Sequence, residues 1–363
     1  MDDSRRALGE EIGGAVRSLW PRRRTWVGYA AAGWSLVYGV LGLHWARGGA
    51  GFPFGRDSDP DADAAESILA GVRAVTAAPV IAGLGMTGAA IALAMTRSQE
   101  REDARRSLLV AASGTAMTLL VVVPDRRLVL SAAYAPIILL RTRFHWSLAG
   151  SAHHPTGATL VFRNGTIPWP VINQLLLVAG GILWAGTAIA YADHGDVAAG
   201  WTTPEAAAQW GRWAVAAAVT VPLVFAVTRW AWALGIPLGI SEAFFQEGQE
   251  SGLWRVGGVL ATVAAGGAAL TLGLTQGWGE VFPGWAVGLA GKPVPPALAV
   301  VPAALASVVV TSAGLGYVRA FLRSGIPEEG WAMVVPGVLW PAWGFALSAA
   351  ALAYYYRRRG VSV

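Results

Sequence analysis

Cysteine is absent from the chain. Without it the protein forms no disulfide and no thiolate metal site, and it carries out no thiol redox chemistry. Lysine is nearly absent as well, because Lys292 is the only one among 27 basic side chains and all the others are arginine. No segment combines clustered basic residues with interleaved aromatic ones, as nucleic-acid binding requires. We therefore expect no nucleic-acid partner.

Charge of either sign is also scarce. Only 13% of the residues are charged, whereas 55% are hydrophobic. A soluble globular domain carries about 25% charged residues. The deficit predicts an all-α integral membrane protein whose principal partner is the lipid bilayer.

The first half contains four apolar stretches that approach or reach the length needed to cross a bilayer, which is about 20 helical residues. We predict spans over residues 25–46, 74–95, 107–123 and 169–192. Residues 1–24 are polar and Arg-rich, which makes the segment before the first span too long for a cleaved signal peptide. The first span is therefore predicted to be a retained anchor.

One further apolar stretch is too short to cross. Residues 128–140 number 13 and include Pro136, so we predict a re-entrant or interfacial segment there rather than a span. An irregular polar linker is expected over residues 141–168. The first half is thus predicted to have four spans. If residues 128–140 do cross the membrane, the alternative is nine spans in the whole chain.

The second half repeats this plan after a linker over residues 193–212. Four more spans are predicted over residues 213–232, 256–274, 297–318 and 332–356, followed by a basic tail at 357–363. The fold class is therefore a polytopic transmembrane helical bundle of about eight spans.

The two halves share an order of similar segments, which predicts an internal duplication. Placing Trp26 on Trp213 brings Val37-Tyr38 onto Val224-Phe225 and Trp45-Ala46 onto Trp232-Ala233. Each of these helix ends leads into a Gly-apolar-Pro-apolar-Gly segment. We predict two parallel four-helix repeats over residues 25–192 and 213–356.

The distribution of arginine predicts the orientation. Basic residues close to a span favour the cytoplasmic side, and they gather in residues 1–24, 97–106 and 357–359, whereas residues 57–66 and 242–250 are acidic. Eight spans place both termini in the cytoplasm. We expect a multi-pass protein of the inner (plasma) membrane.

Two local segments carry a resemblance to known families. Trp45-Ala46-Arg47-Gly48-Gly49, continued by Gly51-Phe52-Pro53-Phe54-Gly55, resembles small four-helix bacterial membrane domains of unknown function. Trp169-Pro170-Val171-Ile172-Asn173-Gln174 and the segment from Trp230 to Gly239 are similar to a larger uncharacterised family of actinobacterial multi-pass membrane proteins. That second resemblance covers most of residues 25–360 and implies a multi-pass helical fold without a known activity.

Few residues suggest a binding site. Ionisable residues within spans are costly and usually functional, and here His44 and Arg229 hold nearly equivalent places in the two halves, beside Trp45 and Trp230. We predict that these four residues bind a polar or anionic ligand, with anchoring at the lipid headgroups as the alternative. Asn173 and Gln174 are further ligand-binding candidates, with hydrogen bonds between helices as their alternative role.

No motif predicts a catalytic residue, a metal site or a cofactor. The chain has no phosphate-binding loop, no Gly-x-Ser-x-Gly elbow and no His-Glu-x-x-His zinc helix. His145, His153 and His154 have no recognisable ligand spacing with one another or with a carboxylate. The acidic segment beginning at Asp57 lacks the glycine and closing glutamate of a calcium loop.

Three functions stay open. The first is transport or permeation of a small molecule through a site between the two repeats, without enzymatic activity. The second is a membrane scaffold or accessory subunit that binds itself as a homo-oligomer or binds a membrane partner protein. The third is a membrane enzyme that modifies a lipid or isoprenoid, with His44 or the histidines at 145–154 as acid or base.

Overall fold

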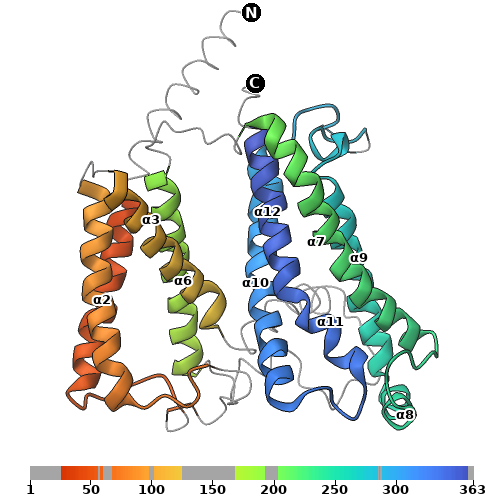
Figure 1. The fold of residues 1–363 in the computed structure, drawn as a ribbon, viewed down its shortest axis with the longest axis horizontal. Coiled ribbons are helices and arrows are strands. Elements are labelled where there is room, and N and C mark those ends of the chain that lie inside the picture. Colours follow the sequence, from red (N-terminus) through yellow and green to blue (C-terminus); the bar gives the residue numbers. More distant parts are fainter. Residues whose placement is uncertain are drawn as a thin grey trace, which may run out of the picture. The chain divides into compact units, whose positions relative to one another are not determined.

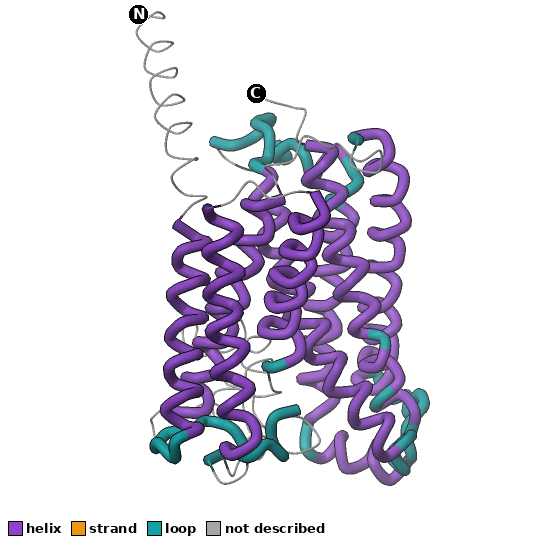
Figure 2. Tube along the Cα trace, turned by 60° about the vertical axis from the view of Figure 1, so that its left-hand side comes forward, coloured by secondary structure: helices purple, strands orange, loops and turns teal. Residues whose placement is uncertain are grey.

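The protein is described here by a computed structural model. It describes residues 26–55, 58–59, 68–97, 102–124, 168–192, 203–284, 286 and 288–358. The predicted segments 1–24, 128–140 and 141–167 lie outside the described residues. Within the described ranges the regular elements are helices (Figures 1 and 2), and eight of them are long and apolar enough to cross a membrane. The predicted all-α transmembrane fold with about eight spans is confirmed.

The described helices fall into two compact units. The first unit contains the helix Trp26–Ala46, α2 (Ala74–Arg97), α3 (Glu102–Met117) with its terminal π-helical turn η1 (Thr118–Val122), and α6 (Trp169–Ala192). The π turn stands just before Pro124. Because a proline disfavours the helical conformation of the residue before it, it fixes the place where this span ends.

Small residues bring the first two helices of this unit into backbone contact. A Cβ added to Gly85 of α2 would lie 2.7 Å from the carbonyl oxygen of Ser35 and 2.5 Å from the Cα of Gly39. Trp184 of α6 completes the junction, because it is buried and its Nε1 donates a hydrogen bond to Ser35 Oγ at 3.2 Å. In lipid such close approach replaces the hydrophobic effect as the source of helix association.

The second unit contains four long helices and two short ones. These are α7 (Pro204–Ala233), α8 (Glu242–Glu250), α9 (Leu253–Leu272), α10 (Pro296–Ser324), α11 (Val335–Val338) and α12 (Trp340–Arg358). Helix α7 packs against both α9 and α12, and α10 packs against α12 (Figure 1).

Helix α7 begins nine residues before the predicted span at Trp213. Thr203 caps it, since its Oγ1 accepts a hydrogen bond from the backbone N–H of Ala206 at 3.3 Å. Pro204 and Glu205 then occupy the first turn, where a fixed φ and a negative charge are both favourable. The predicted start of this span is therefore too late.

The last span is interrupted rather than continuous. It consists of the 3₁₀ turn η4 (Trp331–Met333), then α11, then α12. Pro336 and Pro341 stand in the first turns of α11 and α12, and each disfavours the helical conformation of the residue before it, which separates the helices. The break places the carbonyl oxygen of Ala332 beside α7.

The two Gly-apolar-Pro-apolar-Gly segments are turns of the same kind. Their glycines all have positive φ, namely Gly51 (84°), Gly55 (80°), Gly235 (92°) and Gly239 (71°). Each turn folds back over a tryptophan: the rings of Phe52 and Trp45 are 5.6 Å apart, and Trp232 Nε1 donates to Leu238 O at 2.9 Å. Anchoring at the lipid headgroups was the alternative role for Trp45, but Trp45 and Trp232 are only 3% and 2% exposed. The turns cover them.

Candidate anion site in the second unit

The six predicted site residues are divided between the two units. His44, Trp45, Asn173 and Gln174 belong to the first, and Arg229 and Trp230 belong to the second. Each group is considered within its own unit.

His44 lies at the surface of the first unit. It lines an open hollow of about 430 Å³ together with Arg47 and the apolar side chains of Val40 and Leu43. Its neighbour Trp45 is buried and packs against Phe52 instead. The structure therefore does not bring His44 and Trp45 together on one surface.

Asn173 and Gln174 are both buried in the first unit. The Oδ1 of Asn173 accepts a hydrogen bond of 2.8 Å from Tyr38 Oη, which links α6 to the helix Trp26–Ala46. The Nδ2 of Asn173 has no hydrogen-bond partner among the described residues. The bond between Tyr38 and Asn173 is the interhelical hydrogen bond expected of a neutral polar residue in a span.

Arg229 is a buried arginine that is held by contacts from two elements. It lies one turn before the end of α7 and is only 8% exposed. Its Nη1 donates hydrogen bonds to Thr228 Oγ1 at 2.9 Å and to the carbonyl oxygen of Ala332 at 2.8 Å. The second bond reaches the break in the last span, so the position of the guanidinium is fixed from two elements.

Two aromatic rings hold the guanidinium from α7 itself. Its central carbon lies 4.5 Å from the ring centroid of Phe225 and 4.3 Å from that of Trp232. Such cation–π contacts stabilise a cation through the negative faces of the rings, and they are stronger where water is excluded. They do so without neutralising its charge.

The charge of Arg229 has no partner of opposite sign in the part of the chain that the structure describes. No described carboxylate lies within ion-pair distance of it, and its Nε and Nη2 make no hydrogen bond. An arginine carries five N–H donors, of which three are thus uncommitted. The site holds a desolvated cation with unused hydrogen-bonding capacity.

Two indoles are connected to the guanidinium through the ring of Phe225. The ring of Phe225 also contacts Trp340 of α12 at 5.5 Å, and Trp340 in turn contacts Trp343 at 6.2 Å. Both indole Nε1 atoms are buried and have no hydrogen-bond partner among the residues that the structure describes. Tyr317 of α10 packs on Trp340 at 5.4 Å. We call these five residues, Phe225, Arg229, Tyr317, Trp340 and Trp343, the Arg229 site.

The Arg229 site contains hydrogen-bond donors that have no acceptor among the described residues. Its uncommitted groups are N–H groups of a guanidinium and of two indoles, and an anion accepts hydrogen bonds from such groups. The described residues include no group of three or more His, Asp or Glu side chains that would hold a metal ion. The uncommitted donors match the acceptors of an anionic or polar oxygen-bearing ligand.

Trp230 is not part of this arrangement. Its Nε1 donates to Thr262 Oγ1 of α9 at 3.2 Å. Phe225, Tyr317, Trp340 and Trp343 were not predicted from the sequence as site residues. Only one signal pointed to the last two, the spacing of two tryptophans three residues apart at a helix start, which places both on one face.

The chain matches no protein-family profile, no curated protein and no solved structure.

Proposed function

We propose that this integral membrane protein binds a small anion at the Arg229 site and takes part in its transport or permeation. The observation that carries the proposal is the buried guanidinium with three uncommitted N–H groups and no described carboxylate partner. A charge inside a membrane protein is costly unless it is paired or hydrogen-bonded. A bound anion would provide both the counter-charge and the missing acceptors.

Hydroxyl side chains on α10 serve its contact with α12. Thr311 Oγ1 donates to Ser307 O, and Ser348 of α12 donates to Ser307 Oγ at 2.8 Å. A Cβ on Gly344 of α12 would meet both Thr311 and Ser307, so the two helices are in close contact there. Transport, as distinct from binding, is therefore tested by uptake.

We propose that the Arg229 site faces the outside and that both termini are cytoplasmic. Alternating helices put the start of α7 and the end of α12 at one end of the second unit, where Gly211 meets Ala353. The first end carries Arg212, Lys292, Arg357 and Arg358, and Arg359 follows in the sequence, whereas the other end carries Arg255, Arg319 and Arg323 together with five glutamates. The positive-inside rule counts lysine and arginine, so it favours the first end as the cytoplasmic one. A C-terminal reporter accessible only from outside would contradict this orientation.

Thermal unfolding of the purified protein in detergent tests the binding step. Sodium phosphate, sulfate and acetate are added at equal ionic strength, with sodium chloride as reference. A ligand present at 100 times its Kd stabilises the folded state by about 2.7 kcal/mol, so at least one of these anions is expected to raise the Tm. Arg229→Gln should abolish the rise in Tm, because it replaces the charged guanidinium by a neutral, planar amide.

Arg212→Gln is the matched control, since Arg212 is an exposed arginine near the other end of the same helix. It should keep the anion response. An equal response in Arg229→Gln, or no response of the unaltered protein to any of the three anions, would overturn the proposal.

A second candidate function is the membrane scaffold or accessory subunit. Gly266 and Gly267 on α9 are exposed, and a Cβ added to either would meet nothing within 4 Å. Small exposed residues let another helix approach closely. Because the chain has no cysteine, Gly266→Cys introduces a single thiol, and oxidation in membranes should yield a cross-linked homodimer if a second copy occupies this face. Gly316→Cys, at another open glycine, is the control for random collisions and should not form the cross-link. Absence of the cross-link in Gly266→Cys would exclude a homodimer through this face.

A further inference from the structure

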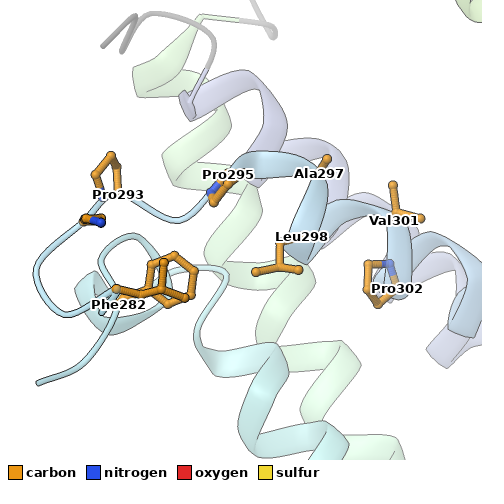
Figure 3. A pocket seen from close by; sticks show the side chains of 9 residues that line it. Phe282, Pro293, Pro295, Ala297, Leu298, Val301 and Pro302 are labelled. Carbon is orange, nitrogen blue, oxygen red and sulfur yellow. The ribbon is translucent and has the colours of Figure 1, made fainter. Parts of the chain in front are cut away.

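An apolar groove lies at the opposite end of the second unit from the Arg229 site. It has a volume of about 660 Å³. Phe282 on the α9–α10 loop lines it from one side, and Leu298, Val301 and Pro302 of α10 line it from the other (Figure 3). Its size is that of a small-molecule binding site.

The loop wall of this groove is held in place by its own hydrogen bonds. Phe282 N donates to Lys292 O and Val294 N donates to Glu280 O, both at 2.9 Å, as in a short hairpin. Helix α12 then fixes the loop from below, because Tyr354 Oη donates to the carbonyl oxygen of Gly279 at 2.9 Å. The groove is therefore formed before any ligand enters.

Charge at the rim of the groove is positive. Glu280 is the only acidic residue of the loop, and it is paired with Arg357 at 3.1 Å and Arg358 at 3.7 Å. Lys292 is exposed, and its Nζ donates to Gly288 O at 2.9 Å. That bond uses one of three donors, so the ammonium group keeps two for a ligand, and no described carboxylate pairs with it.

The open side of the groove continues onto the lipid-facing surface of α10. Leu298 and Val301 are 57% and 52% exposed, and Leu305, farther along the helix, is 57% exposed. Helix α10 is one of the eight candidate spans. A hydrocarbon chain in the bilayer can thus pass from the side of α10 into the groove without crossing water.

We propose that this groove retains one anionic phospholipid. Its acyl chain lies against Phe282, Leu298 and Val301, and its phosphate accepts hydrogen bonds from the ammonium group of Lys292. With this end of the unit cytoplasmic, as proposed above, the groove lies where a basic residue attracts anionic headgroups. The site is separate from the Arg229 site, and either can exist without the other.

Native mass spectrometry of the full-length protein in detergent tests the proposal. The protein is incubated with phosphatidylglycerol or with phosphatidylcholine of identical acyl chains, and the retained lipid is counted. We expect one phosphatidylglycerol per chain and about fivefold weaker retention of phosphatidylcholine, the preference that one basic group gives near a membrane surface. Lys292→Gln should reduce phosphatidylglycerol to the level of phosphatidylcholine.

Two tryptophan substitutions separate the groove from general lipid contact. Leu298→Trp fills the groove and should abolish retention of both lipids. Leu305→Trp adds the same bulk on the exposed surface of α10 outside the groove and should leave retention unchanged. Equal retention of both lipids by the unaltered protein, or equal losses in Leu298→Trp and Leu305→Trp, would overturn the proposal.

Discussion

Tyr38 in the first unit and Phe225 in the second correspond when Trp26 is placed on Trp213, yet their neighbours differ in kind. Tyr38 donates a hydrogen bond to Asn173, a neutral residue of α6. Phe225 contacts the guanidinium of Arg229 and the indole of Trp340. The first unit uses its polar groups to join two helices, whereas the second leaves a cation and two indole N–H groups without acceptors.

The same pairing of halves places Arg229 opposite Gly42. A Cβ on Gly42 would lie 2.8 Å from the Cα of Ala82, so the two helices are in backbone contact there. In the second unit, a Cβ on Gly257 of α9 would lie 3.7 Å from Arg229 Cγ. At this position the first unit has Gly42, which lets two helices touch. The second unit has Arg229, which faces Gly257 of the neighbouring helix. This difference is why the anion site is proposed in the second unit rather than in the first.

The largest expected effect concerns the backbone contact of the first unit. Gly85→Ala should lower the free energy of unfolding by about 3 kcal/mol, the upper part of the usual range for overpacking, because the new methyl group meets the backbone of Ser35 and Gly39. Gly83→Ala is the control on the same helix, where a Cβ meets nothing within 4 Å. Denaturant unfolding in micelles measures both, and equal stabilities would refute the close contact.

A smaller effect is expected at the hydrogen bond of the first unit. Tyr38→Phe removes the donor to Asn173 and should cost about 1 kcal/mol. Tyr29→Phe, on an exposed tyrosine of the same helix, should cost nothing measurable. The double variant Tyr38→Phe, Asn173→Leu should recover part of the loss because it also removes the orphaned amide, and a purely additive double variant would argue against the bond.

The smallest stability effect is expected at Arg229. Arg229→Met keeps much of the length of the side chain and removes the desolvated charge, so in anion-free buffer it should change the free energy of unfolding by less than about 1 kcal/mol. Removing one partner of a buried charge pair costs about 3–5 kcal/mol. A loss of that size, measured by the same unfolding experiment, would show that Arg229 stabilises the second unit. Arg229 would then be a structural residue, like Tyr38.

Sequence reasoning reached the fold because length and hydropathy alone specify a spanning helix. It placed the start of α7 at Trp213 although Thr203, Pro204 and Glu205 form a recognisable helix start. The side-chain contacts in the core of the bundle could not be predicted, for a different reason. Which side chains meet depends on the rotation of each helix about its axis, and periodicity is weak in helices that face lipid on one side and small residues on the other.

The same reason explains how much of the candidate site was found. Arg229 was identified because a charge within an apolar span is rare. Trp340 and Trp343 were not, since aromatic residues are common at helix ends in membranes and their contact with Phe225 depends on the break near Pro336. His44 was grouped with Arg229 by position in the repeat, but it is exposed, whereas Arg229 is buried.

Uptake of labelled anions into proteoliposomes tests the central claim most directly. Radiolabelled phosphate, sulfate and acetate are offered to vesicles that contain the unaltered protein, Arg229→Gln or Arg212→Gln. We predict uptake of at least one anion above that of protein-free vesicles, a decrease of about tenfold or more in Arg229→Gln, and none in Arg212→Gln. Equal uptake by the unaltered protein and Arg229→Gln, or no uptake of any of the three anions above protein-free vesicles, would contradict the account.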